Sequence, residues 1–242
     1  MNGTAGSPVR IRPIFLIVGG AAGLIGGATH GDLPEGSGAA ALQFVADHPG
    51  YALVHLVSIL GAVLWTLGLS GWRAKLGASQ WLAGAAGRVA LIGAAVLAVQ
   101  FSLDGIGMEA LAALWSAPGS SRGVFEAIAA IAPEALVGTA LVWVMLLYGL
   151  TPILAGSSLI LEHQVILGWS GLVLGTFSLV GGLSLAIGLG GVPDWLVFAG
   201  STIGVNLWII ALGIDTLRKM AKPSAPALAR APRRPRASRR PD

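Results

Sequence analysis

The stretch Gln100-Phe-Ser-Leu-Asp-Gly-Ile-Gly-Met-Glu109 places a carboxylate within a run of residues that otherwise has the composition of a membrane-spanning helix. A charged side chain near the centre of a bilayer costs at least about 2.5 to 3.5 kcal/mol, so it usually faces the protein interior and has a partner. Ionisable residues at this depth are also functional-site candidates. We therefore expect Asp104 to lie in a polar site inside a helical bundle.

The composition of the 242-residue chain is that of a membrane protein, with 55% hydrophobic and only 11% charged residues. Its mean hydropathy is +0.78. Irregular backbone in contact with lipid would leave polar groups unsatisfied, and the apolar runs lack the alternation of a barrel, so helices are expected. We predict an all-α, polytopic bundle of six transmembrane helices, each run having about the 20 residues that a span needs. The predicted spans are residues 13–30, 49–70, 84–108, 134–155, 163–188 and 194–216.

Basic residues are distributed unevenly among the segments that connect these spans. If the first connection faces outward, fourteen of the fifteen Lys and Arg lie on the cytoplasmic side, and Arg122 alone lies outside. Cytoplasmic loops of membrane proteins carry such an excess of basic residues. We therefore expect a protein of the bacterial inner membrane with both termini in the cytoplasm. Tyr51 and Trp115 would then belong to the outer aromatic belt and Trp81 to the inner one.

Composition divides the chain into a cytoplasmic N-terminus at 1–12, a transmembrane domain at 13–220 and an Arg/Pro-rich tail at 221–242. The whole chain has a net charge of +4, and residues 222–242 alone contribute +6. Such a segment cannot bury a core, so we expect a disordered cytoplasmic tail. Its expected partner is the anionic headgroups of membrane lipids rather than nucleic acid. The tail residues assigned to lipid binding are Arg233, Arg234, Arg236, Arg239 and Arg240.

The first span follows Arg10 and Arg12, a pattern that signal peptides share. No convincing small-x-small cleavage site is present around residues 26–30, so we expect an uncleaved helix. Its glycines recur at small-xxx-small spacing, which predicts a close-packed seam against a neighbouring helix.

We expect the segments between the spans to be loops, including residues 31–48, with one exception. Residues 121–133 carry apolar residues at helical spacing. They form either a short helix on the outer membrane surface or an outward extension of the fourth span that breaks at Pro133.

His55 is the predicted partner of Asp104. At 1.5 Å per residue, Asp104 lies roughly 24 Å from Arg88 in a hydrocarbon core of about 30 Å, and His55 lies about 6 Å from Tyr51 at the outer side. The two side chains therefore share one depth, on helices joined by a short connection. We predict that they are in contact.

Small polar residues extend this site inward along neighbouring helices. They are Ser58 and Gln100, with Thr176, Thr202 and Asn206 on the last two spans. One interpretation is a hydrated, proton-bearing cavity that opens to the outside. The other is an interhelical hydrogen-bond cluster, which is worth about 0.6 to 2 kcal/mol per contact.

A metal site is a further possibility on the outer side, where His30, His48, His55 and Asp104 gather. Imidazole and carboxylate ligands suit zinc or copper, although no compact signature such as H-E-x-x-H is present. Haem would require two axial histidines, for which His30 and His55 are the candidates. The chain contains no cysteine, which excludes disulfides, thiolate metal sites, iron-sulfur clusters and c-type haem attachment. We expect no cofactor.

His30 after the first span, Asp47-His-Pro and His55 at the second, and Asp104-Gly105 in the third together resemble a group of six-helix integral membrane proteins of high-GC bacteria. The resemblance implies this architecture, and it implies neither a substrate nor catalytic residues.

Three classes of function follow from these observations. The leading hypothesis is proton-linked or small-solute transport through a polar site at His55 and Asp104. The alternatives are a non-catalytic subunit or homo-oligomeric partner of a membrane complex, and a metal- or haem-binding membrane enzyme. Nucleophile elbows, P-loops and dinucleotide fingerprints are absent from the sequence, so we favour a protein without enzymatic activity.

Overall fold

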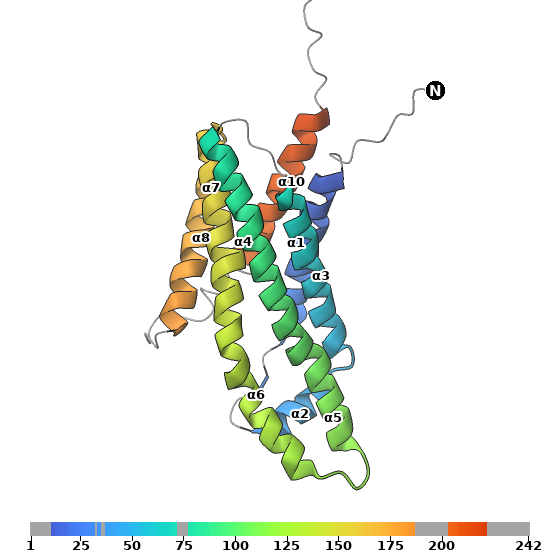
Figure 1. Cartoon of the computed structure of the whole chain (residues 1–242). Coiled ribbons are helices and arrows are strands. Elements are labelled where there is room, and N and C mark those ends of the chain that lie inside the picture. The colour runs from blue at the N-terminus through green and yellow to red at the C-terminus, as the bar shows by residue number, and fades with distance from the viewer. Residues whose placement is uncertain (1–10, 32, 35–36, 72–76, 187–202, 222–242) are drawn as a thin grey trace, which may run out of the picture.

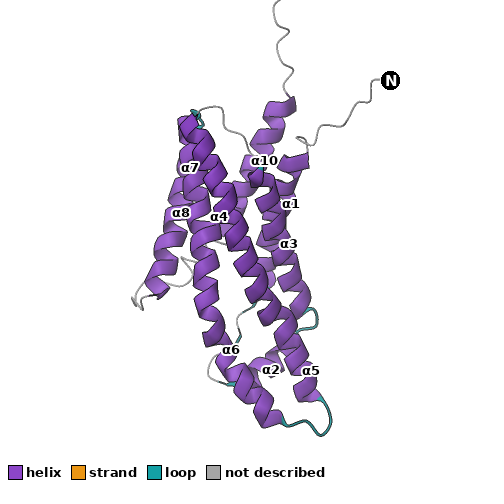
Figure 2. Cartoon of the chain, viewed as in Figure 1, coloured by secondary structure: helices purple, strands orange, loops and turns teal. Residues whose placement is uncertain are grey.

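The computed structural model describes residues 11–31, 33–34, 37–71, 77–186 and 203–221. Within these ranges the chain is helical and contains no strand (Figure 2), so the predicted all-α class is confirmed. The elements in chain order are α1 (Ile11–Thr29), α2 (Gly38–Asp47), α3 (Tyr51–Ser70), α4 (Gly77–Phe101), the π-helical segment η2 (Ser102–Gly107), α5 (Met108–Ser116), α6 (Arg122–Trp143), the π-helical segment η3 (Val144–Leu150), α7 (Thr151–Leu161), α8 (Val165–Ala186) and α10 (Asn206–Ala221).

Five helices of the described residues are long and apolar enough to cross a membrane. Large apolar side chains on their outer faces are exposed, among them Leu53 (63%), Leu91 (61%) and Ile166 (83%). Such a surface suits lipid rather than water, in which large exposed apolar patches are rare. These helices agree with a membrane-embedded protein. They comprise residues Ile11–Thr29, Tyr51–Ser70, Gly77–Ser116, Gly138–Leu161 and Val165–Ser184.

The sixth predicted span, residues 194–216, lies partly outside the described residues. Its described part is α10, which continues to Ala221, beyond the predicted end of the span. Residues 1–10 and the tail at 222–242 also lie outside the described ranges.

The third predicted span is the middle of a longer rod. α4, η2 and α5 follow one another without a break from Gly77 to Ser116, over 40 residues. At 1.5 Å per residue this rod is about 60 Å long, which is twice the thickness of a hydrocarbon core of about 30 Å. Part of the rod therefore projects from a bilayer.

The helix that contains the fourth predicted span begins before residue 134, although its membrane-length apolar part, Gly138–Leu161, begins after it. α6 is helical from Arg122, so residues 122–133 form an extension of the helix that contains the fourth span rather than a separate surface helix. The helix does not break at residue 133, which corrects the expected interruption there.

A helix replaces most of the loop that was predicted for residues 31–48. The side chain of Ser37 accepts a hydrogen bond from the backbone N–H of Ala40 and caps the start of α2. α2 then lies with α5 and the start of α6 at one end of the bundle (Figure 1), where Leu42 and Met108 are buried. We call α2, α5 and residues 122–132 of α6 the cap.

The cap also buries two aromatic residues that the sequence assigned to a membrane interface. Tyr51 is 3% exposed, and Trp115 is 9% exposed with its indole N–H donated to Glu126 Oε1 at 2.9 Å. That assignment is wrong for both, because neither side chain lies on the outer surface of the protein. Trp81, by contrast, is 65% exposed.

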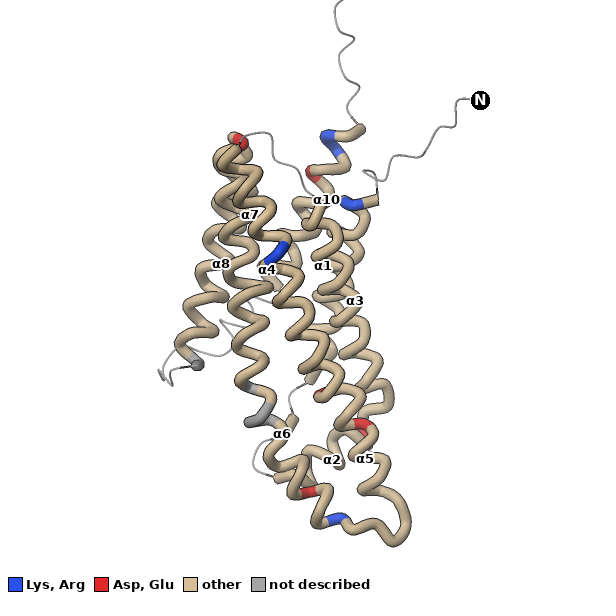
Figure 3. Tube along the Cα trace, in the orientation of Figure 1, with Lys and Arg blue, Asp and Glu red and all other residues tan. Residues whose placement is uncertain are grey.

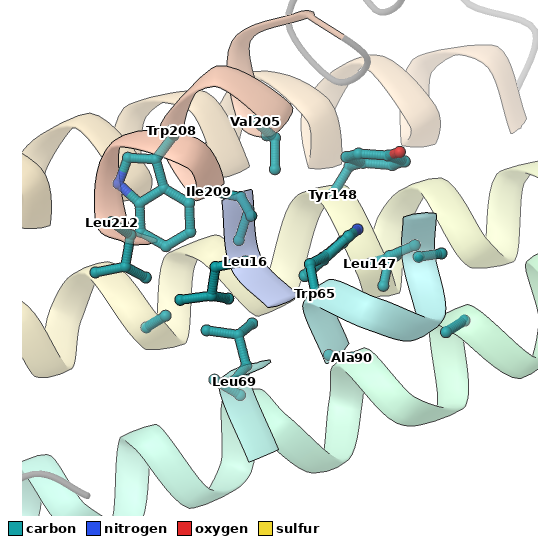
Figure 4. Close-up of a cluster of buried hydrophobic side chains, with 14 of the residues drawn as sticks. Leu16, Trp65, Leu69, Ala90, Leu147, Tyr148, Val205, Trp208, Ile209 and Leu212 are labelled. Carbon is teal, nitrogen blue, oxygen red and sulfur yellow. The ribbon is translucent and has the colours of Figure 1, made fainter. Parts of the chain in front are cut away.

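The main core lies between α1, α3, α4, η3 and α10, where Leu16, Trp65, Leu147 and Ile209 converge (Figure 4). The predicted glycine seam is confirmed at the contact of α1 with α3. A Cβ atom built on Gly19 would lie 2.5 Å from the backbone N of Trp65, so only glycine allows the two helices to lie this close.

Most Lys and Arg of the described residues lie toward the end of the bundle where α1 begins and α10 ends, whereas the cap is at the opposite end (Figure 3).

Candidate functional site

Asp104 lies in η2 and is only 7% exposed. A π-helical segment interrupts the regular repeat of an α-helix, and such segments are frequent at functional sites. The segment Ser-Leu-Asp-Gly-Ile-Gly contains two glycines. Gly105 leaves space for His55 of the neighbouring helix α3, because a Cβ atom at this position would lie 2.6 Å from His55 Cγ.

α3 supplies two side chains that contact Asp104. Tyr51 and His55 are four residues apart and therefore lie on the same face of the helix. The Tyr51 hydroxyl donates a hydrogen bond to Asp104 Oδ1 at 3.0 Å. His55, which has no exposed surface, places its Nε2 atom 3.2 Å from Asp104 Oδ2. The predicted contact between His55 and Asp104 is therefore present.

His30 completes the cluster from the end of α1. Its Nε2 atom lies 3.4 Å from Asp104 Oδ2, and 25% of its side chain is exposed. Its ring centroid is 4.6 Å from that of His55 and 5.6 Å from that of Phe101, so aromatic rings enclose the imidazole. Three helical elements far apart in the sequence thus meet at one carboxylate.

A backbone carbonyl group determines which ring nitrogen of His55 carries a proton. Nδ1 lies 2.8 Å from the carbonyl oxygen of Tyr51, which can only accept, so Nδ1 is the donor. In the neutral ring Nε2 then carries a lone pair that lies near the carboxylate. The buried Nε2 atoms of His55 and His30 make no hydrogen bond of acceptable geometry. The cluster is therefore suited to take up a proton or a cation.

A cavity of about 200 Å³ adjoins the cluster. Its size and polar wall allow it to hold several water molecules, because a water needs room and polar partners. The cavity is lined by Gly23, Gly27, His30, Ser58, Leu97, Gln100, Phe101, Asp104, Trp143 and Tyr148.

Polar contacts continue from this cavity toward the centre of the bundle. The Gln100 side-chain oxygen accepts a hydrogen bond from the indole N–H of Trp143. Farther in, the buried side-chain amide of Asn206 donates to the hydroxyl of Tyr148 at 3.4 Å. Tyr148 belongs to η3, so the π-helical segments η2 and η3 both line the same cavity.

Several residues assigned to the polar site from the sequence meet here. Ser58, Gln100 and Asp104 line the cavity, His55 contacts Asp104, and Asn206 reaches the cavity wall through Tyr148. Thr202 lies outside the described residues. Thr176 is exposed on α8 and donates to the carbonyl of Leu172 in its own helix, so the proposed extension through this residue is wrong.

His48 does not join the other metal-ligand candidates. Its ring stacks on Phe44 with centroids 4.0 Å apart, and its Nδ1 atom lies 2.6 Å from the Phe44 carbonyl oxygen. His30, His55 and Asp104, in contrast, each offer a donor atom, and these atoms lie within 4.8 Å of one another.

The sequence interpretation missed Tyr51 and Tyr148 as members of the site. A signal was available for Tyr51, because it precedes His55 by one helical turn and therefore shares its face. No comparable signal exists for Tyr148, whose position depends on how α6, η3 and α7 pack.

The arrangement does not fit a haem with His30 and His55 as axial ligands. Both Nε2 atoms lie against the same carboxylate oxygen, and the ring centroids are only 4.6 Å apart, which leaves no room for a macrocycle between them. The cavity of about 200 Å³ is also smaller than the 300 to 1,000 Å³ usual for small-molecule sites.

No family model, no curated protein and no solved structure matches this chain at a significant level. The function must therefore be inferred from the geometry of the site.

Proposed function

We propose that this is a six-span protein of the bacterial inner membrane, with both termini in the cytoplasm, that carries protons in a transport step through the cavity beside Asp104. The cavity is the observation that supports the proposal most strongly. A mere packing gap in an apolar bundle is lined by apolar groups and stays dry. This cavity instead has a carboxylate, an imidazole, an amide and two hydroxyl groups on its wall.

The cluster offers groups that can exchange a proton with water in the cavity. Asp104 Oδ2 accepts from either imidazole once that ring is protonated at Nε2, since both atoms already lie within 3.4 Å. Carboxylate and histidine groups inside membrane proteins serve as proton relays. His30, which is partly exposed and also lines the cavity, is the member of the cluster through which a proton enters.

A purely structural role is the weaker explanation of the cluster. Interhelical hydrogen bonds contribute about 0.6 to 2 kcal/mol each, and Ser or Asn side chains would supply them. An ionisable aspartate costs at least about 2.5 kcal/mol to place in a membrane, so the chain carries a group more costly than structure alone requires.

Proton flux in liposomes tests the proposal. The purified full-length protein is reconstituted with a pH-sensitive dye inside, and a potassium gradient with valinomycin drives protons inward. Sodium, magnesium and zinc salts are present outside in turn, without external potassium, so that the potassium gradient persists. Asp104→Asn removes the carboxylate of the cluster. Asp215→Asn makes the same chemical change at a partly exposed salt bridge in α10, where Lys219 Nζ lies 2.5 Å from Asp215 Oδ2, and serves as the control.

We expect internal acidification with the wild-type protein and with Asp215→Asn, and the rate of protein-free liposomes with Asp104→Asn. Wild-type protein that acidifies no faster than empty liposomes under every salt contradicts the proposal. So does an Asp104→Asn protein with the wild-type rate.

A further inference from the structure

We propose that His30, His55 and Asp104 bind a divalent transition-metal ion of the zinc class. The donor atoms are the Nε2 atoms of both imidazoles and Oδ2 of the carboxylate. Both nitrogens are buried and make no hydrogen bond of acceptable geometry, although each lies within 3.4 Å of Asp104 Oδ2. His55 is fully buried, so no water satisfies its Nε2 atom from the surface. The inference rests on the proposed function in one respect: the metal ion would bind to the same residues beside the cavity that we propose to carry protons.

The distances between donor atoms fit a tetrahedral ion. Zinc binds imidazole nitrogen and carboxylate oxygen at about 2.0 to 2.2 Å, so two ligand atoms on a tetrahedron are about 3.4 Å apart. The two distances to Asp104 Oδ2 are 3.4 Å from His30 and 3.2 Å from His55. One donor atom from each of the three residues lies within 4.8 Å of the others, so small side-chain rotations close the remaining edge.

Tyr51 fixes two of the three ligands in the form that a metal requires. Its carbonyl oxygen accepts the Nδ1–H of His55 at 2.8 Å, which presents the Nε2 lone pair to the ion. Its hydroxyl donates to Oδ1 of Asp104 at 3.0 Å, which leaves Oδ2 for the metal. Metal-binding histidines commonly donate their second ring N–H to a carbonyl or carboxylate in this way. One residue therefore orients both ligands.

The ligand types select the class of ion. Imidazole with carboxylate suits zinc, copper, iron and nickel, whereas magnesium and calcium prefer oxygen ligands. Three protein ligands with an open fourth position are typical of zinc sites that exchange water or substrate. The open position lies toward the cavity, because His30 and Asp104 both form part of its wall. A divalent cation would also neutralise the carboxylate, which is costly to bury alone.

Metal binding to the full-length protein in detergent tests the inference. The protein is purified through a tag without histidine, stripped with a chelator, and titrated with Zn²⁺ by calorimetry and with Co²⁺ by visible absorption. The variants are His30→Gln, His55→Gln and Asp104→Asn. His48→Gln is the matched control. His48 directly follows α2 of the cap, and it contacts Phe44 instead of the cluster.

We expect one Zn²⁺ per wild-type chain, no competition by excess Mg²⁺, and d–d bands of tetrahedral Co²⁺. Each cluster variant should weaken Zn²⁺ binding at least about tenfold, and Tyr51→Phe by about 10- to 100-fold, as for other residues that orient metal ligands. His48→Gln should bind as the wild type does. His30→Gln carries the test if the fully buried variants do not fold, because His30 is partly exposed.

Wild-type protein that binds no Zn²⁺, or cluster variants that bind it with wild-type affinity, would overturn the inference. The two proposals fail separately. Zn²⁺ binding that depends on the cluster, without proton flux, supports the metal site and contradicts proton transport. Proton flux that depends on Asp104, without Zn²⁺ binding, supports proton transport and contradicts the metal site.

Discussion

Gly105 of η2 lies directly against the imidazole of His55, and a Cβ atom at this glycine would stand 2.5 Å from the Cβ atom of His55. The glycine thus sets the distance between α3 and the π-helical segment. It also places Asp104, the preceding residue, beside the His55 ring.

Gly105→Ala should therefore displace His55 and open the cluster. We expect a loss of stability of about 1 to 3 kcal/mol, the usual cost of overpacking a tight contact, together with weaker Zn²⁺ binding. Thermal unfolding in detergent and calorimetry measure the two effects.

Gly107→Ala is the control within the same segment, because a Cβ atom there would have its nearest contact at 3.7 Å, with the Ser102 carbonyl oxygen. Alanine also stabilises helical backbone by roughly 0.5 to 1 kcal/mol relative to glycine. Equal stability of the two variants would show that the contact between Gly105 and His55 does not position the cluster.

The coupling of His55 with Asp104 can be measured by a double-mutant cycle. Removing one partner of a buried pair leaves the other unpaired and costs about 3 to 5 kcal/mol. We expect His55→Leu and Asp104→Asn each to destabilise the protein, and the double variant to cost less than the two single costs added. Chemical unfolding in detergent gives the free energies. Additive costs, with coupling below about 0.5 kcal/mol, would mean that the two side chains do not interact in the folded protein.

The pairing of His55 and Asp104 could be predicted because it depends on depth alone. Each span advances by a fixed rise per residue, and two ionisable groups at the same depth on neighbouring helices have strong reason to meet. The contact of His30 with Asp104 could not be derived from depth in this way, although the sequence made His30 a metal-ligand candidate. His30 comes directly after Thr29, the last residue of α1, where helical periodicity no longer fixes the position of a side chain.

The cap escaped prediction for a related reason. Residues 38–47 form a helix too short to be stable alone, and helices of this length depend on tertiary packing. Their partners are α5 and residues 122–132 of α6, which are distant in the sequence. Most of α5 was expected to be a loop, and the start of α6 either a surface helix or an extension of the fourth span. The π-helical segments could not be predicted from hydrophobic periodicity either. η3 continues an apolar run, and the polar and glycine residues of η2 do not by themselves specify a π-helical backbone.

The glycine seam between α1 and α3 should tolerate no side chain at Gly19. A Cβ atom there would lie 2.5 Å from the backbone N of Trp65 and 2.7 Å from the carbonyl oxygen of Gly61, and backbone atoms cannot rotate away. We expect Gly19→Ala to lower the melting temperature in detergent. Gly84→Ala, whose nearest contact would be the flexible end of Arg88 at 3.7 Å, should leave it nearly unchanged. A stable Gly19→Ala protein would argue against the close contact of these helices.

The basic tail is predicted to bind lipid and not to pack on the bundle. Deleting residues 223–242 should leave the melting temperature of the detergent-solubilised protein nearly unchanged. It should weaken binding to liposomes with anionic headgroups, since each basic residue near such a surface contributes about 1 kcal/mol. Liposomes of neutral lipid are the control. A drop of many degrees on deletion would show instead that the tail is docked on the folded body.

The orientation of the bundle can be tested at four positions that alternate between its ends. Ala40 and Pro118 lie in or beside the cap, and Ala78 and Ser158 lie near the other end, where α4 begins and α7 ends (Figure 1). Because the predicted topology places fourteen of the fifteen basic residues on one side, we expect topology reporters fused at 40 and 118 to be outside and those at 78 and 158 to be cytoplasmic.

Single cysteines provide an independent check, because the natural chain has none and each introduced thiol is unique. Ala78→Cys and Ser121→Cys are both at exposed positions. An impermeant thiol reagent added to intact cells should label Ser121→Cys at the start of α6, and Ala78→Cys only after lysis. A cytoplasmic reporter at residue 40, or labelling of Ala78→Cys in intact cells, would show that the protein has the opposite orientation in the membrane. The cap would then face the cytoplasm, and protons or metal ions would reach His30 from inside the cell instead of from outside.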